Sequence, residues 1–272
     1  MITKNERALL YLLSQASPLT RMKLVKLMFL ASNEQKLYDF VPYQYGPFSF
    51  QLYQDMRHLE RYSFLSQINE EVNFLGQVFP KPDAGVQKTI NLCVNQFGDY
   101  LEKDLIDYVY QKYPEMTIFS TIKRLKSYCR DETGIATVGY EGKNIDKFLM
   151  LLIENKIGKL IDVRKNAFSM KYGFSKNQLS GALNKLGISY LHFPELGIDS
   201  AKRNNLNQKG YADLFNNYAL ELSEKEAILN NIKSLAQNEK VALMCFEAKA
   251  SDCHRNVIAQ RFRDEGLVVV NL

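Results

Sequence analysis

Reactive side chains gather in the second half of the chain, directly after short apolar runs. Asp162 and Arg164 stand at the end of one such run, and Cys245 and Glu247 stand at the end of another. A carboxylate can activate water while a guanidinium holds a phosphate, so this mixture of residue types is typical of general acid–base catalysis on an anionic substrate. The residues therefore indicate hydrolysis or group transfer.

Two sets of candidate residues follow from this chemistry. Glu247 or Asp162 would activate water, His254 would carry a proton, and the arginines would hold phosphate. The catalytic candidates are Asp162, Glu195, Glu247, Cys253 and His254; the candidates for substrate or phosphate binding are Tyr140, Glu141, Arg164, Ser169, Lys171, His192, Cys245 and Arg255. A salt bridge or a helix cap is the simpler explanation for any one of them, so the cluster is the stronger evidence.

The elements that would position these residues alternate between strand and helix. Residues 136–140, 160–163, 189–193, 241–245 and 268–270 are β-rich, and helical stripes of apolar residues separate most of them. Strands joined by helices of this length favour a mainly parallel sheet flanked by helices. Because ligand sites in such sheets lie beyond the carboxyl ends of the strands, we expect the candidate residues to share one edge.

The last long helix is expected to begin at the end of this cluster. Asp252 is a plausible N-cap, which would place Cys253, His254 and Arg255 in the first helical turn, where the helix dipole favours an anion. Arg255 would then suit a phosphate. An ion pair between Arg255 and Asp162 or Glu247 is the alternative.

The cysteines allow two other kinds of site. A thiol phosphatase or rhodanese needs an arginine six positions after its cysteine, but position 251 is Ser251, and Arg255 follows Cys245 by ten positions. A zinc site from Cys245, Cys253 and His254 is disfavoured because adjacent ligands on one helical turn point about 100° apart. Four cysteines without a pairing pattern indicate free thiols in a reducing compartment. We expect no metal and no cofactor.

The first half of the chain predicts a helical domain, residues 1–131, ahead of an α/β domain, residues 132–272. Apolar residues recur at helical spacing on both sides of the turn Ser17–Thr20, and a third helix is expected from about Phe50. The first two helices resemble a helix-turn-helix whose second helix offers Arg21, Lys23 and Lys26 to DNA. Most helical hairpins bind no DNA, so a purely structural role is the simpler interpretation.

Composition limits the class of protein. The chain has 272 residues, of which 46% are hydrophobic and 24% charged, with a net charge of +5, so it can bury a core and tolerate a polyanionic partner. Its longest apolar runs are far shorter than the ~20 residues that cross a bilayer. The mixed charge of residues 1–7 is unlike a secretory signal, and we expect a cytoplasmic protein without a membrane partner. The sequence does not determine the oligomeric state.

Two family resemblances add to this interpretation. Thr137–Tyr140, Leu160–Arg164, Phe168–Ser169, Tyr190–Gly197, Cys245–Glu247 and Cys253–Arg255 resemble the family called domain of unknown function 488 (DUF488) over about residues 134–272. That resemblance implies a site at the quoted residues without supplying a reaction. Lys26–Leu30 and Tyr45–Pro47 resemble the Panacea antitoxin-associated domain over residues 1 to about 130, which implies a protein partner and a role in toxin–antitoxin or defence systems.

Two functions remain open at this point. The first is a hydrolase or transferase that acts on a nucleotide or nucleic acid at a glycosidic or phosphoester bond. The second is an antitoxin-like or regulatory module that binds a nucleotide or DNA without turnover. Both predict a nucleic acid or nucleotide as partner.

Overall fold

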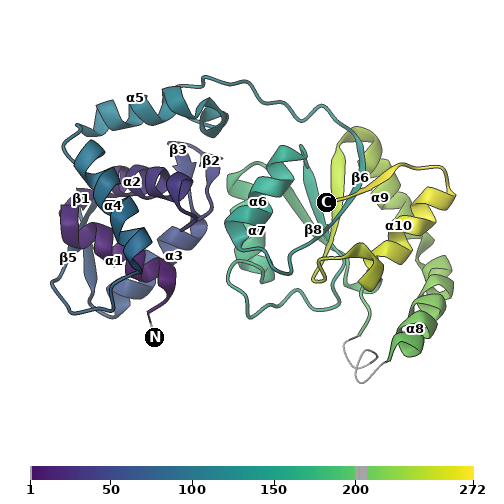
Figure 1. The fold of residues 1–272 in the computed structure, drawn as a ribbon. Helices are drawn as coiled ribbons and strands as arrows, with labels where there is room; N and C mark the ends of the chain where they lie inside the picture. Colours follow the sequence, from purple (N-terminus) through teal and green to yellow (C-terminus); the bar gives the residue numbers. More distant parts are fainter. Residues whose placement is uncertain (1, 200–201, 203–206) are drawn as a thin grey trace. The chain divides into compact units, whose positions relative to one another are not determined.

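The computed structural model describes residues 2–199, 202 and 207–272 and contains two compact units, residues 1–128 and 129–272 (Figure 1). This division and the predicted boundary after residue 131 both lie in the stretch 118–133, which forms no helix or strand. Helices account for 51% of the structure and strands for 15%, which confirms the mixed α/β class. In the described part of the chain, no helix is long and apolar enough to span a membrane.

The first unit is built from helices and two small antiparallel hairpins. Its elements are α1 (Lys4–Ala16), β1 (Leu19–Thr20), α2 (Arg21–Glu34), β2 (Val41–Tyr43), β3 (Gly46–Phe48), α3 (Phe50–Arg61), β4 (Leu65–Ile68), β5 (Glu71–Phe74), α4 (Ala84–Phe97), α5 (Glu102–Lys112) and the short 3-10 helix η1 (Pro114–Thr117). Strands β2 and β3 pair with each other, and β1, β5 and β4 form a sheet in that order. Helices α1, α2 and α3 were predicted, whereas α4, α5 and the hairpins were not.

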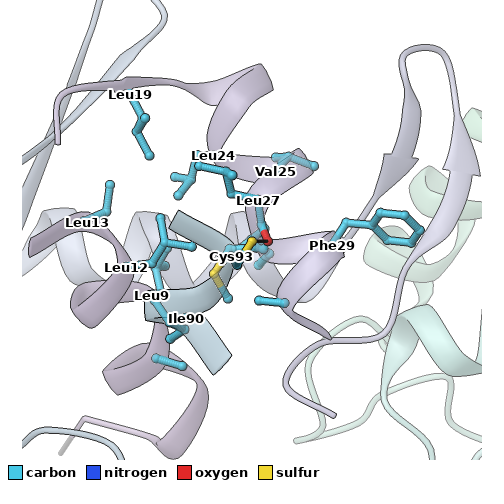
Figure 2. Close-up of a cluster of buried hydrophobic side chains, with 14 of the residues drawn as sticks. Leu9, Leu12, Leu13, Leu19, Leu24, Val25, Leu27, Phe29, Ile90 and Cys93 are labelled. Carbon is cyan, nitrogen blue, oxygen red and sulfur yellow. Dashed lines mark hydrogen bonds between the residues drawn. The ribbon is translucent and has the colours of Figure 1, made fainter. Parts of the chain in front are cut away.

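Local sequence explains where these helices begin. Thr20 and Ser49 were expected near helix starts, and their side chains accept hydrogen bonds from the backbone N–H groups of Lys23 and Leu52. Each cap satisfies a donor that the first helical turn leaves unpaired. The apolar stripes of α1 and α2 then pack against α4, where Cys93 Sγ lies 3.4 Å from the carbonyl oxygen of Leu27 (Figure 2).

The second unit is a five-stranded parallel sheet with helices on both faces. Its elements are β6 (Gly134–Gly139), α6 (Ile145–Glu154), β7 (Lys159–Asp162), α7 (Lys176–Lys185), β8 (Ser189–His192), η2 (Pro194–Leu196), α8 (Gln208–Glu221), η4 (Leu222–Lys225), α9 (Glu226–Asn238), β9 (Lys240–Cys245), η5 (Ala250–Asp252), α10 (Arg255–Asp264) and β10 (Val269–Asn271). The strand order is β10-β6-β9-β7-β8, and every pairing is parallel. The predicted parallel sheet is therefore confirmed.

Helices cover the two faces of this sheet, with α6 and α7 on one face and α9 and α10 on the other (Figure 1). Successive residues of a strand point to opposite faces. Ile161, Val163 and Cys245 belong to the core under α9 and α10, whereas Asp162 lies between Ile161 and Val163 and points to the opposite face. One edge of the sheet thus carries two separate groups of side chains.

The expected cap of the last helix is wrong, and α7 lacks a side-chain cap. Asp252 ends the 3-10 turn η5, and α10 begins only at Arg255, with His254 as its N-cap. Ser175 does precede α7, but its side chain makes no cap bond, because its hydroxyl bonds the backbone of Ser169 instead. The extra turn at residues 250–252 changes where Cys253 and His254 point.

Candidate functional site

The carboxyl ends of β6, β7, β8 and β9 meet at one edge of the sheet, because the four strands are parallel and in register. Gly139 pairs with Cys245, and Asp162 pairs with His192 and Met244. The loops that follow these strands carry the predicted site residues. The parallel sheet therefore brings these loops to one edge, as predicted.

Asp162 and Arg164 form a buried ion pair on the face covered by α6 and α7. Asp162 is completely buried, and its carboxylate accepts hydrogen bonds from Arg164 Nε at 2.9 Å and Arg164 Nη2 at 2.6 Å. Tyr190 donates its hydroxyl hydrogen to the same carboxylate at 2.7 Å. Arg164 also donates to Tyr140 Oη at 3.0 Å and to the carbonyl oxygen of Phe174 at 3.0 Å. Neither charge faces solvent.

This arrangement gives the Asp162–Arg164 pair a structural role. Burial opposes the charged form of Arg164, yet hydrogen bonds and the charge of Asp162 raise its pKa above the usual value. His192 contributes to the same network, since its Nε2 lies 2.9 Å from the carbonyl oxygen of Arg164. The pair joins the ends of β7 and β8 to the loop before α7, and it leaves no carboxylate oxygen that could activate water.

Arg255 is also buried, and it holds the loop that follows β9. Its guanidinium donates to the carbonyl oxygens of Glu247 at 2.6 Å and Ala248 at 3.0 Å. Gly139 allows this loop to fold back over the end of β6, because a Cβ at Gly139 would lie only 1.8 Å from the carbonyl oxygen of Glu247. Arg255 therefore fixes the backbone of residues 247–248 and does not face a phosphate.

A second cluster lies on the face covered by α9 and α10. The Sγ atoms of Cys245 and Cys253 lie 4.0 Å and 3.8 Å from His254 Nδ1, and all three residues are buried. The other ring nitrogen, Nε2, lies 3.0 Å from the carbonyl oxygen of Val163. The half-buried Glu247 carboxyl lies within hydrogen-bonding reach of both thiols. Four of the predicted residues therefore do come together.

The groups of this cluster change one another's ionisation. Burial raises the pKa of Glu247, and the nearby Cys253 raises it further. Burial also opposes ionisation of Cys253, but hydrogen bonds from Cys245 and His254 and the charge of Arg255 lower its pKa. The hydrogen bond to Cys253 and burial together raise the pKa of Cys245. The pKa shifts of the two cysteines are therefore opposite in direction, and Cys253 is the thiol that ionises more readily.

The sequence disfavoured a metal site because Cys253 and His254 were expected to occupy one helical turn, where their side chains would diverge. Cys253 is instead extended, with φ −138° and ψ 142°, and it precedes α10. The three donor atoms of Cys245, Cys253 and His254 lie within 4.8 Å of one another, close enough to hold a metal ion.

Lysines gather where β6 ends. Lys143 donates to the carbonyl oxygen of Gly139 at 2.9 Å, and Lys171 lies 3.4 Å from that of Tyr140. Burial lowers the pKa of Lys143, and the neighbouring charges of Lys147, Arg255 and Lys171 lower it further. Glu141 accepts a hydrogen bond from the backbone N–H of Ala248, which ties this loop to the one that follows β9. Ser169 accepts a hydrogen bond from the backbone N–H of Lys171.

A cleft of about 440 Å³ lies on the α8 side of the same unit. Glu195 lines it together with Lys165, Lys202 and Lys225, and the buried Tyr218 lies between the cleft and the cysteine cluster, its ring 5.6 Å from that of His254. Glu195 was predicted as a site residue, whereas Lys143, Lys165 and Tyr218 were not. Lysines that follow a predicted strand could have been identified as candidate site residues. Tyr218 belongs to the apolar stripe of a helix, which indicates core packing and gives no sign of a site.

Residues 144–262 match the family model described as domain of unknown function DUF488. The match covers the C-terminal unit from the start of α6 almost to the end of α10, and it includes both the Asp162–Arg164 pair and the cysteine cluster. No curated protein and no solved structure matches the chain. The match supports the DUF488 resemblance for the C-terminal half, and the resemblance of residues 1–130 to the Panacea domain stays a prediction.

The cations proposed for DNA contact in the first unit are engaged within the protein. Lys26 is buried and donates to the carbonyl oxygen of Tyr45, and Lys23 donates to that of Gly98 at 2.6 Å. Arg21 forms an ion pair with Glu70 at 3.1 Å. A buried lysine cannot reach a phosphate without repacking, so this arrangement favours the structural interpretation of the three cations.

Lys26 makes the stability of the first unit depend on pH. Burial lowers its pKa to about 7, although Glu102 acts in the opposite direction. Because the folded-state pKa lies below the unfolded one, the stabilisation by neutral Lys26 is present above about pH 10 and is lost as pH falls to about 7. We therefore compare the free energy of unfolding of Lys26→Met with that of the natural chain. The difference in favour of the variant is expected to be larger at pH 6 than at pH 10, by a few kcal/mol.

This prediction is checked by urea denaturation of the full chain at both pH values, followed by circular dichroism. Lys103→Met, at an exposed position of α5, controls for the loss of a surface charge. If Lys26→Met differs from the natural chain by the same amount at pH 6 and pH 10, Lys26 remains charged in the folded protein.

Proposed function

We propose that the C-terminal unit is a hydrolase or transferase that acts on a nucleotide or nucleic acid, with Glu247 as its acid–base residue. Glu247 is half-buried at the edge where the strands end. Its carboxyl lies close to the two cysteines, and its backbone carbonyl lies against Gly139. A carboxyl group that is only partly exposed can exchange a proton with a bound substrate. This placement of Glu247 is the observation that carries the proposal.

The substrate is proposed to be anionic because cations surround this edge. Lys143 is partly buried and lies near Lys147, Arg255 and Lys171, whose positive charges lower its pKa further. Like charges held together repel unless an anion neutralises them, and phosphate groups are the usual anion in such sites. A phosphoester or a glycosidic bond of a nucleotide would then lie near Glu247.

Other candidates are assigned supporting roles. Asp162 and Arg164 shape the loop before α7, and Arg255 fixes the loop that carries Glu247. His254 and Cys253 lie beneath Glu247 and are too buried to contact a substrate directly. Glu195 lies in the cleft with Lys165 and Lys225, where it would contact a longer substrate.

A second candidate is a regulatory module that binds a nucleotide without turnover. It is favoured because several of the predicted reactive side chains are engaged within the protein. Asp162 and Arg164 bind each other and the surrounding protein, and both terminal nitrogens of Arg255 donate to backbone carbonyl oxygens. A binding site needs the lysines alone. A protein partner for the N-terminal unit would fit this second candidate.

Turnover by the full chain distinguishes the two candidates. Nucleotides, single-stranded oligonucleotides and damaged duplexes are offered as substrates, and products are separated by chromatography. Glu247→Gln is expected to lower the rate about a hundredfold to ten-thousandfold, the range for loss of a general acid or base. Glu154→Gln, an exposed position at the end of α6, should retain the full rate.

The outcomes separate clearly. Product formation that Glu247→Gln removes and Glu154→Gln keeps would support the enzyme. Salt-sensitive binding without product would support the regulatory module, because counterion release weakens phosphate contacts as salt rises. Turnover that is equal in both variants would overturn the role of Glu247.

A further inference from the structure

We propose that Cys245, Cys253 and His254 bind one thiophilic metal ion, with Zn²⁺ as the best fit. The residues come from the end of β9, from the connection between η5 and α10, and from the N-cap of α10. Cys253 and His254 follow Cys245 by eight and nine positions in the sequence. Their side chains converge because the loop 246–252 turns back over the sheet edge. This assignment stands apart from the proposed activity.

The distances between the donor atoms suit a tetrahedral ion. A zinc ion with sulfur ligands at about 2.3 Å and a nitrogen ligand at about 2.0 Å separates its donors by roughly 3.5–3.8 Å. His254 Nδ1 lies 3.8 Å from Cys253 Sγ and 4.0 Å from Cys245 Sγ, and no pair of the three donor atoms is separated by more than 4.8 Å. The two distances to Nδ1 need to shorten by a few tenths of an ångström, and the distance between the sulfur atoms by at most about 1 Å.

The imidazole of His254 is oriented as a metal ligand. Its Nε2 lies 3.0 Å from the carbonyl oxygen of Val163, which can only accept a hydrogen bond, so Nε2 carries the hydrogen. In neutral His254 the lone pair is therefore on Nδ1, the atom that faces both sulfur atoms. Histidine ligands of metals usually donate their second nitrogen to a carbonyl or carboxylate in this way. The ring of Tyr218 packs against the imidazole in a T-shaped contact and further restrains it.

The loop that supplies Cys253 is fixed before any ion arrives. Arg255 donates to the carbonyl oxygens of Glu247 and Ala248, and the backbone N–H of Cys253 donates to the carbonyl oxygen of Ala250 at 3.1 Å. Ligands that are already held in place lose little entropy on binding. The site is thus preorganised by contacts that do not involve the three donor atoms.

The donor set selects the class of metal. Two cysteine sulfurs and one imidazole suit zinc, whereas magnesium and calcium require oxygen ligands. Three protein ligands leave a fourth position in a tetrahedral ion for water or another ligand. The Glu247 carboxyl lies close to both cysteines. The alternative for two neighbouring thiols is a Cys245–Cys253 disulfide, which would exclude the ion.

Metal content tests the proposal directly on the full chain. The protein is purified under reducing conditions without chelator, and its zinc content is measured by inductively coupled plasma mass spectrometry. The natural chain and Cys129→Ser, which changes an exposed cysteine, should each hold about one zinc ion per chain, and Cys253→Ser should hold none. The assay needs no substrate, so its outcome is independent of whether the proposed activity exists.

A second measurement guards against a variant that fails to fold. In the Cys93→Ala/Cys129→Ser double variant, Cys245 and Cys253 are the remaining cysteines. Addition of Co²⁺ should then produce the thiolate-to-cobalt charge-transfer band and the strong visible bands of a tetrahedral complex. Absence of zinc together with absence of these bands would overturn the proposal, as would recovery of a Cys245–Cys253 disulfide in metal-free protein.

Discussion

Asp162→Asn is expected to lower the free energy of unfolding of the C-terminal unit by about 3–5 kcal/mol, the cost of leaving a buried charge without its partner. The carboxylate accepts hydrogen bonds from the backbone N–H and the guanidinium of Arg164 and from the hydroxyl of Tyr190. Asparagine is neutral and presents one acceptor oxygen, so the Arg164 guanidinium would remain buried and uncompensated.

Chemical denaturation of the full chain measures this loss. Tyr190→Phe removes a single hydrogen bond to the same carboxylate and should cost about 1.5 kcal/mol. Asp162→Asn combined with Arg164→Met should recover part of the stability, since it removes the orphaned charge. A loss below about 1 kcal/mol in Asp162→Asn would mean that Asp162 is not needed for the fold, and it would return to the list of candidate catalytic residues.

The arrangement of strands in the C-terminal unit could be predicted because its signals are local. Apolar runs such as 241–245 and the helical stripes between them fix the alternation, and a parallel sheet brings the strand ends to one edge. The grouping of loops followed from that topology alone. The two hairpins of the first unit were not predicted because their strands have only three or four residues each, too few to show a clear alternation.

The face to which each side chain points could not be predicted in the same way. Strands β7 and β9 are buried on both sides, so their sequences show continuous apolar runs and no alternation. The shared edge was therefore interpreted as one site, whereas Asp162 and Cys245 lie on opposite faces. One signal was available: Asp162 and Arg164 are two residues apart, the spacing that places side chains on the same face of an extended chain.

The start of the last helix was misplaced for a related reason. Asp252 is a good N-cap residue, and sequence alone does not reveal that the chain first makes the 3-10 turn Ala250–Asp252. That turn leaves Cys253 extended and brings its sulfur toward Cys245. The metal-binding geometry therefore depends on a local conformation that propensities do not determine.

Gly139→Ala is expected to destabilise the C-terminal unit by about 3 kcal/mol, at the upper end for overpacking, because the obstacle is backbone. The new methyl group would lie 1.8 Å from the carbonyl oxygen of Glu247 and 2.7 Å from its carbonyl carbon, and neither atom can rotate away as a side chain can. The loop must move outward, and this movement breaks the hydrogen bond of Arg255 to the same oxygen.

Gly181→Ala is the matched control for this substitution. Gly181 lies at an exposed position inside α7, where a Cβ would meet nothing within 4 Å, so alanine should raise the unfolding free energy by about 0.5–1 kcal/mol through better helix propensity. Opposite signs for two identical substitutions in one unit would show that the close approach at Gly139 is responsible. Since Glu247 and the Cys245 end of β9 move with the loop, Gly139→Ala should also lose bound zinc and turnover together. If Gly139→Ala is as stable as the natural chain, the loop 246–248 can shift without cost, and the position of Glu247 is not fixed by the fold.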